Sequence, residues 1–185
     1  RLAVTHVALA ASTKVRSTDV KRTLTSFGGI TRTTTWEAWT TALAATPTEL
    51  LVLMPHTDPK VKTLEISGKP LRSGRIERKH VTGPHEIAPV VMLFGCDTAG
   101  SKDDPAGYVP RFMAKGAAVV FSTLTMLLGR HAAALSERLG TTLRAPDRTV
   151  QPLGEVIATF RREAVRDGLI SALAVTAYGD ADWKV

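Results

Sequence analysis

Two side chains that together can perform nucleophilic chemistry, His56 and Cys96, each follow an apolar run of sequence. The run at 50–54 reads LLVLM and ends two residues before His56, and the run at 89–94 reads PVVMLF and ends two residues before Cys96. A cysteine attacks as its thiolate, and the free thiol has a pKa of about 8.5. A neighbouring imidazole that accepts the proton therefore raises the reactive fraction at neutral pH. We expect His56 and Cys96 to form a catalytic dyad.

The competing interpretation of Cys96 is structural. It is the only cysteine of the chain, so no internal disulfide forms, and a lone thiol is often just a small buried hydrophobe. The spacing of the two residues does not by itself establish contact. The remaining histidines fall within a strand, in polar loops or on a helix rather than at a comparable strand end; they are His6, His80, His85 and His131.

Strands and helices are expected to alternate along the chain, because runs rich in β-branched residues are separated by stretches with helical apolar spacing. The expected strands are 2–10, 30–34, 50–54, 89–94, 117–122 and 169–177. The expected helices are 19–27 with a cap at Ser17 or Thr18, a helix carrying Trp36 and ended by Thr46 and Pro47, 105–115 capped by Asp104 with Pro105 at its first position, 125–139 and 153–167. Between 60 and 86 we expect a small antiparallel excursion with strands near 61–66 and 71–76.

This alternation predicts an α/β fold with a mostly parallel central sheet of about six strands, covered by helices on both faces. In such sheets functional groups collect at the carboxyl ends of the strands, where both His56 and Cys96 are expected. A chain of 185 residues suits one domain spanning 1–185. Because the first residue is not Met, we expect this domain to be excised from a larger chain.

The segment 90–118, VVMLFGCDTAGSKDDPAGYVPRFMAKGAA, resembles the core motif of caspase-like peptidases of the bacterial CHAT type. In that family an apolar strand ends in a small residue, Cys, an acidic residue and Thr, followed by a helix and a Gly-Ala turn into another strand. The segment 50–58, LLVLMPHTD, is similar to the histidine strand of the family, and 173–183, LAVTAYGDADW, is similar to its closing strand. The resemblance covers nearly the whole chain and implies a caspase-like three-layer sandwich.

The resemblance implies a cysteine endopeptidase acting on a protein or peptide substrate, with Cys96 as nucleophile and His56 as acid and base. It places the N–H groups of Thr57 and Cys96 at the oxyanion, and it implies neither metal nor cofactor. The family usually has Gly where Thr57 stands; threonine keeps the N–H but adds a side chain, and it is also an ordinary turn residue. Asp97 either lines the pocket for the residue before the scissile bond or caps its own loop. Asp58 is ambiguous in the same way.

The loop from Asp97 to Asp104 is short, whereas caspases that mature by cleavage carry a long linker after the cysteine segment. We therefore expect a single-chain enzyme controlled by a regulatory partner domain or protein. Two other classes stay open: a catalytically weak or inactive caspase-like scaffold for protein interaction, and a nucleotide-binding doubly wound domain. The last lacks both a G-x-G-x-x-G after the first strand and a Walker-type loop.

The net charge of +7 raises the question of nucleic acid. The densest basic cluster lies in a Gly-punctuated hairpin without interleaved aromatic residues for base stacking; its members are Lys69, Arg72, Arg75, Arg78 and Lys79. We therefore expect a solvated basic face or an acidic partner surface rather than a nucleic-acid interface. No apolar run approaches the roughly 20 residues of a membrane span, and a single thiol without an export signal predicts the reducing cytoplasm.

Overall fold

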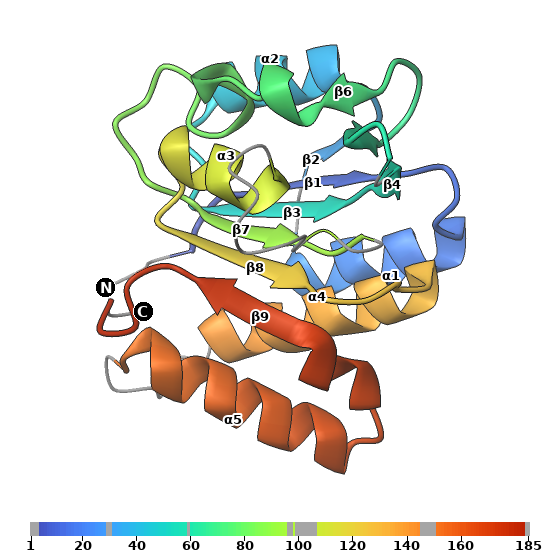
Figure 1. Cartoon of the computed structure of the whole chain (residues 1–185), viewed down its shortest axis with the longest axis vertical. Coiled ribbons are helices and arrows are strands. Elements are labelled where there is room, and N and C mark those ends of the chain that lie inside the picture. Colours follow the sequence, from blue (N-terminus) through green and yellow to red (C-terminus); the bar gives the residue numbers. More distant parts are fainter. Residues whose placement is uncertain are drawn as a thin grey trace.

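The chain folds around one central six-stranded sheet. The computed structural model describes residues 4–28, 31–58, 60–95, 98, 107–144 and 151–183. In spatial order the strands are β2 (Thr31–Thr33), β1 (Val7–Ala11), β3 (Leu50–Met54), β7 (Val90–Leu93), β8 (Val119–Thr123) and β9 (Val175–Tyr178). All neighbouring pairs are parallel except β8 and β9. The five parallel strands therefore end at one edge of the sheet, on the right in Figure 1.

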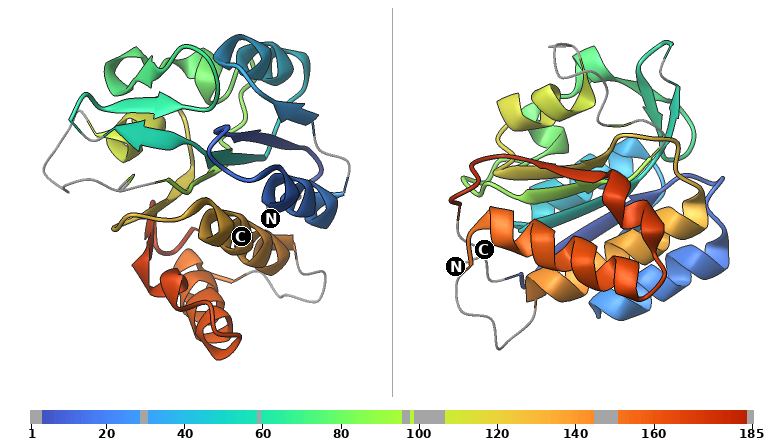
Figure 2. Two further views of the ribbon diagram at one scale, coloured as in Figure 1. Left: turned by 90° about the vertical axis from the view of Figure 1, so that its right-hand side faces the viewer. Right: turned by 60° about the horizontal axis from the view of Figure 1, so that its bottom comes forward.

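Helices cover both faces of this sheet (Figures 1 and 2). One face packs against α1 (Ser17–Phe27), α4 (Gly129–Arg144) and α5 (Leu153–Arg166), and the other against α2 (Trp36–Ala45) and α3 (Tyr108–Ala114). Every residue of β3 and β7 is buried, as the continuous apolar runs require when both faces are covered. These features confirm the predicted three-layer α/β architecture with a mostly parallel sheet.

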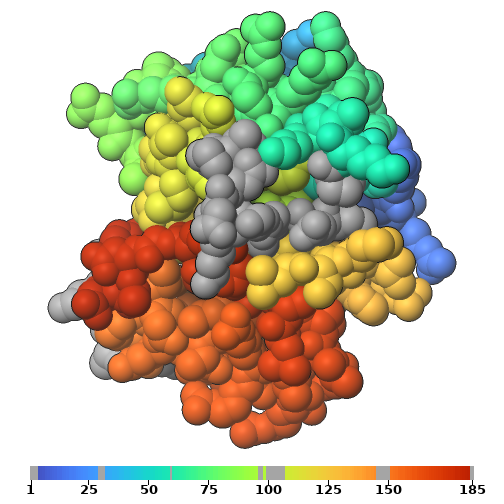
Figure 3. Space-filling model, viewed as in Figure 1, coloured from blue at the N-terminus to red at the C-terminus, as the bar shows by residue number. Residues whose placement is uncertain are grey.

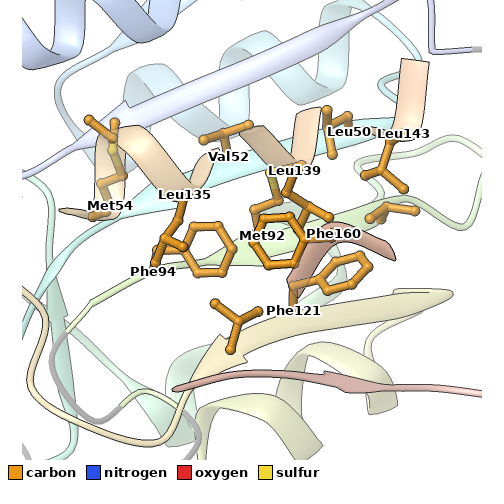
Figure 4. Close-up of a cluster of buried hydrophobic side chains, with 14 of the residues drawn as sticks. Leu50, Val52, Met54, Met92, Phe94, Phe121, Leu135, Leu139, Leu143 and Phe160 are labelled. Carbon is orange, nitrogen blue, oxygen red and sulfur yellow. The ribbon is translucent and has the colours of Figure 1, made fainter. Parts of the chain in front are cut away.

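The larger core lies between the sheet and α1, α4 and α5, and Figure 4 shows its centre. There Met92 and Phe121, from neighbouring strands, pack with Leu139 of α4 and Phe160 of α5, and all four side chains are buried. Burying a side chain of this size contributes about 1.5–3 kcal/mol. The strands whose ends carry His56 and Cys96 are thus held by a well-filled layer.

A second core on the opposite face joins the sheet to the segment between β3 and β7. Trp39 of α2 and Phe112 of α3 are fully buried there together with Leu64. Leu64 belongs to a small antiparallel sheet formed by β4 (His56–Asp58), β5 (Thr63–Glu65) and β6 (Leu71–Arg72). Two 3₁₀ turns, Ser73–Arg75 and Arg78–His80, follow it. The predicted antiparallel excursion is confirmed, and β4 is a strand that the sequence did not indicate.

The ends of several elements differ from the prediction. Ser17 is the first residue of α1 and Arg16 is its N-cap without a side-chain hydrogen bond, so neither Ser17 nor Thr18 caps the helix. α4 begins at Gly129 rather than at 125, because the chain bends at 124–125 after β8 and has no regular structure at 126–128; the Leu124 N–H donates to the carbonyl of Ala174 at 2.9 Å.

The remaining differences concern α3 and the last strand. The helix predicted to begin at Pro105 begins instead at Tyr108. Gly107 is the N-cap of α3, and its extended backbone (φ −65°, ψ 164°) is not part of the helix. Asp104 and Pro105 themselves lie outside the described residues. The predicted strand 169–177 divides into a 3₁₀ helix, Ile170–Ala174, and β9, which runs antiparallel to β8.

The two ends of the described chain lie side by side at the amino ends of the parallel strands (Figures 1 and 2). Val4 and Trp183 both pack on the larger core, and the Leu153 N–H donates to the carbonyl of Trp183 at 2.9 Å. Both ends are therefore remote from the edge at which β3 and β7 finish. In the part of the chain that the structure describes, none of the helices combines the length and apolarity that crossing a bilayer requires.

Candidate active site

The strands β3 and β7 are neighbours in the sheet, which brings the two predicted catalytic segments to the same edge. Leu53 and Leu93 are register partners, and the Phe94 N–H donates to the carbonyl of Leu53 at 2.9 Å. His56 and Cys96 each stand three residues beyond this pair. Since adjacent strands are about 4.8 Å apart, the two segments leave the sheet side by side. Cys96 and Asp97 themselves lie outside the described residues, so their side chains are not located.

At Gly95 these two segments pack closely against each other. A Cβ atom at this position would lie 2.8 Å from the carbonyl oxygen of Pro55 and 3.2 Å from the Thr57 methyl carbon. Real Cβ atoms essentially never approach a backbone oxygen so closely. The glycine before Cys96 is therefore required by packing against the residue that precedes His56.

A buried hydroxyl network fixes the chain on both sides of Cys96. The Thr98 hydroxyl donates to the carbonyl of Leu93 at 2.8 Å and accepts from the Ser122 hydroxyl at 2.8 Å. It also lies 3.1 Å from the Thr123 hydroxyl, which itself donates to the carbonyl of Gly95 at 2.6 Å. Thr98, Ser122 and Thr123 are all fully buried. Residues 95 and 98, on either side of the Cys96–Asp97 step, are thus anchored to the end of β8.

His56 begins β4 and is half-buried. It faces Glu65 across the β4–β5 ladder, and side chains directly opposite in such a ladder have Cβ atoms about 4.5–5.5 Å apart. Thr57 points to the other face of β4, because side chains alternate along a strand, and it is only 3% exposed. The Thr57 side chain therefore packs inward against Gly95, away from the face on which His56 lies.

A cavity of about 190 Å³ opens at the ends of β3 and β7. His56 and Gly95 both line it, which places the imidazole and the residue before Cys96 on the same hollow. The remaining walls come from the loop after β1, from the residues that follow β3 and β7, and from the segment before α4 and its first turn; they are Ser12, Lys14, Val15, Pro55, Phe94, Leu127, Leu128, Gly129 and Ala132. In Figure 3 the small sheet and the segment after β8 border the same side of the molecule.

The loop after β1 positions Lys14 beside His56. The Ser12 N–H donates to the carbonyl of Met54 at 2.9 Å, and the buried Ser12 hydroxyl accepts from the Lys14 N–H at 3.2 Å. These two bonds fold the loop over the end of β3. Lys14 was not singled out from the sequence, because only the fold brings 14 and 56 to one cavity.

A second hollow of about 390 Å³ lies over the outer face of the small sheet. His56 and Lys14 line it as well, so it adjoins the first. Asp58, the ambiguous carboxylate of the sequence, lies on this face. Its side chain accepts from the Lys60 N–H at 2.9 Å, which is the loop-capping role expected of Asp in a turn.

The described residues contain no group of three or more His, Cys, Asp or Glu side chains arranged to hold a metal ion. Of the predicted site residues, His56 lies at the expected strand end, Thr57 is buried next to Gly95, and Cys96 and Asp97 fall outside the described residues. From the sequence, Thr98 was named only as part of the family motif and given no role, and Ser122 and Thr123, two hydroxyl residues at the end of an apolar strand, were not singled out.

No protein-family model matches this chain, and no curated protein matches its sequence.

Proposed function

We propose that this chain is a caspase-like cysteine endopeptidase that uses Cys96 as nucleophile and His56 as acid and base. The observation that carries the proposal is the shared cavity: His56 and Gly95, the residue before Cys96, line one hollow at the ends of adjacent parallel strands. The buried Thr98 network supports it further, because a nucleophile needs a rigid loop to hold its geometry.

In this proposal the Cys96 thiolate attacks the carbonyl carbon of a peptide bond and forms a C–S bond. Backbone N–H groups of Thr57 and Cys96 stabilise the oxyanion. His56, which holds the proton taken from the thiol, delivers it to the amine nitrogen as the C–N bond breaks. Water, deprotonated by His56, then attacks the thioester, and the sulfur leaves as the thiol. No net proton, electron or co-reactant is required beyond water.

The test is labelling by a peptide that carries a thiol-reactive group, followed by cleavage assays on a peptide library. Labelling should occur at Cys96 in the wild type and be absent in Cys96→Ala. His56→Ala should reduce the labelling rate by about 10²–10⁴-fold, the usual contribution of general acid–base catalysis. His131→Ala, a half-buried histidine on α4, is the matched control and should label like the wild type.

A wild type that does not label, while remaining folded, would reject the peptidase and leave a caspase-like scaffold for protein interaction. Asp97 is tested in the same library: Asp97→Asn should lose a preference for basic residues before the scissile bond if it lines that pocket, and should leave the profile unchanged if it only caps its loop.

We further propose that the enzyme works as a single chain under the control of a regulatory partner domain or protein. The segment from Asp97 to Asp104 is short, which leaves little room for a maturation linker. Intact mass after prolonged incubation should stay that of the uncut chain. Stoichiometric cutting between residues 97 and 104 would reject this mode of control.

A further inference from the structure

The outer face of the small antiparallel sheet carries polar side chains that continue away from His56. In the register of β4, β5 and β6, Asp58 pairs with Thr63 and Thr63 with Arg72. The alternate set, Thr57, Leu64 and Leu71, faces the second core. Arg72 therefore lies on the same face as His56, which the second hollow confirms, because both residues line it.

A third and larger hollow, of about 810 Å³, lies beyond Arg72, between the β5–β6 turn and the start of α2. Pro70 and Arg72 line both the second and the third hollow, just as Lys14 and His56 line both the first and the second. Hollows that share wall residues adjoin one another. The three hollows follow one another from the ends of β3 and β7, past the small sheet, to the start of α2; we call this row of hollows the β6 groove.

The far end of the β6 groove is basic on its rim and apolar on its floor. Lys69, Arg72 and Arg75 line it and are exposed, and Glu37 is the only acidic residue among the described residues of its lining. Across the described chain none of these three cations takes part in a salt bridge. Trp36, which is 9% exposed, supplies part of the floor.

The middle of the groove is more balanced, since Lys14 and Arg72 there face Asp58 and Glu65. Positive charge therefore accumulates with distance from His56. Three exposed cations that form no salt bridge in the described chain favour an anionic ligand, because opposite charge across an interface speeds encounter and selects the partner.

A polypeptide fits this groove better than a nucleic acid does. Binding of single strands relies on exposed aromatic rings on which bases stack. The indole of Trp36 is instead packed edge-to-face against Trp39 and His80, and its N–H donates to the carbonyl of Leu64 at 3.2 Å. An apolar floor with a basic rim suits an extended peptide that carries acidic side chains.

We infer that the β6 groove binds an acidic segment of the protein substrate, through Lys69, Arg72 and Arg75. With strands about 4.8 Å apart and residues about 3.4 Å apart along a strand, the backbone of Arg72 lies about 12 Å from that of His56. An extended peptide covers this distance in about four residues. The acidic residues therefore stand about four residues or more from the bond that is cut. This inference rests on the proposed function, since it assigns the substrate class of the same site.

Binding is measured on Cys96→Ala, which cannot turn substrate over, by fluorescence anisotropy of a labelled peptide carrying a run of glutamates. The glutamate peptide should bind at least about tenfold more tightly than its glutamine counterpart, and added salt should weaken it. Replacing Lys69, Arg72 and Arg75 together by Gln should abolish the difference. The matched control replaces Arg130, Arg162 and Arg166, exposed arginines on α4 and α5, and should keep it.

A charge-reversal variant distinguishes loss of the binding charges from loss of the fold. Arg72→Glu combined with Arg75→Glu should lose the glutamate peptide and gain a lysine peptide, which only a folded groove can do. Equal binding of the glutamate and glutamine peptides would overturn the inference. Displacement of the glutamate peptide by a single-stranded DNA oligonucleotide at lower concentration than by the unlabelled peptide would also overturn it, in favour of nucleic acid.

Cleavage assays separate this inference from the proposed function. Tight glutamate-peptide binding without any turnover by the wild type supports the groove and rejects the peptidase. Turnover by the wild type with the same kcat/KM for glutamate-bearing and glutamine-bearing substrates supports the peptidase and rejects the groove. If both hold, the triple Gln variant should raise KM for the glutamate-bearing substrate by about tenfold.

Discussion

The Ser122 hydroxyl donates to the Thr98 hydroxyl at 2.8 Å, and both side chains are fully buried. This contact ties the loop after β7 to the end of β8, one strand further along the sheet. The step from Cys96 to Asp97 lies between two anchored residues, Gly95 and Thr98. The chain on either side of the candidate nucleophile is therefore held by β8, none of whose residues lines the cavity.

Thr98→Val should lower both stability and activity. The substitution keeps the side-chain shape but removes the hydroxyl that donates to the carbonyl of Leu93 and accepts from the Ser122 hydroxyl, at a cost of about 1–3 kcal/mol in the free energy of unfolding. Thr98→Ser, which retains the hydroxyl, should recover most of the activity. The matched control is Ser136→Ala, because Ser136 is equally buried but bonds only to the carbonyl of Ala132 within α4. Urea unfolding and probe labelling rates measure the two effects; full labelling by a folded Thr98→Val would contradict the anchoring role.

Gly95→Ala should separate the ends of β3 and β7. Its Cβ would meet the backbone oxygen of Pro55 at 2.8 Å, and backbone cannot rotate away as a flexible side chain can. Overpacking of this kind typically costs about 1–3 kcal/mol, and labelling of Cys96 should fall as well. Gly154→Ala in α5 is the control: its Cβ has only the Ala181 oxygen near it, at 3.9 Å, and alanine should stabilise the helix by up to about 1 kcal/mol. Calorimetry and denaturant titration measure the free energy of unfolding. A Gly95→Ala variant as stable as the wild type would contradict the close approach.

His80 gives the fold a sensitivity to mild acid. It is buried, its Nδ1 accepts from the Glu77 N–H at 3.0 Å, and its ring packs against Trp36. Burial, and secondarily the charge of Lys79, lowers the pKa of His80 below its ordinary value of 6.5. The unfolded chain therefore takes up the proton more readily than the folded one. The stabilising contribution of the neutral ring is complete above about pH 6.5 and decreases as the pH falls from there toward the folded-state pKa.

We expect the free energy of unfolding of the wild type to be lower at pH 5.5 than at pH 7.5, and the difference to be smaller in His80→Asn. Asparagine can accept the Glu77 N–H without titrating. Urea titrations at the two pH values provide the measurement. An identical pH dependence in the two proteins would show that His80 is not the sensitive group.

Arg144, the last residue of α4, binds the carboxyl end of α1. Its guanidinium donates to the carbonyls of Ser26 and Phe27, at 2.6 and 3.1 Å, and lies 4.7 Å over the Phe27 ring. Arg144→Ala should cost about 1–3 kcal/mol, since charged hydrogen bonds to helix carbonyls and a cation–π contact are lost together. Arg144→Lys should recover only part, because an ammonium cannot reproduce the planar fork. Arg130→Ala, an exposed residue of the same helix, should stay within about 0.5 kcal/mol of the wild type.

The predictable parts of the fold are those in which a short stretch of sequence determines the secondary structure by itself. The apolar runs 50–54 and 90–93 have no polar face, so they had to be strands buried on both sides, and their pairing followed from chain order. β4 was not predictable, because three polar-leaning residues, His56 to Asp58, become a strand only by pairing with β5. The same applies to Leu124–Leu128: its apolar residues suggest a helix, but Met126 is 81% exposed and the segment runs on beyond β8.

The candidate site divides in the same way. The placement of His56 at a strand end was readable, whereas the hydroxyls that hold the Cys96 loop were not, because Thr98 and Ser122 meet only through the order of strands in the sheet. The residues of the basic cluster could be identified from the sequence. Arg72 lines both the hollow beside His56 and the hollow that Lys69 and Arg75 line, and this depends on how the β5–β6 turn folds against α2, which no local pattern encodes.

The two ends of the described chain, Val4 and Trp183, pack on the larger core, and the chain ends lie at the edge of the sheet opposite the ends of β3 and β7. A substrate or inhibitor sequence attached at either chain end must therefore extend along the whole length of the strands before it reaches the cavity at the ends of β3 and β7. With a short tether, cutting can occur only between molecules, so its rate should rise with protein concentration, whereas a long tether permits the reaction within one molecule and removes that dependence.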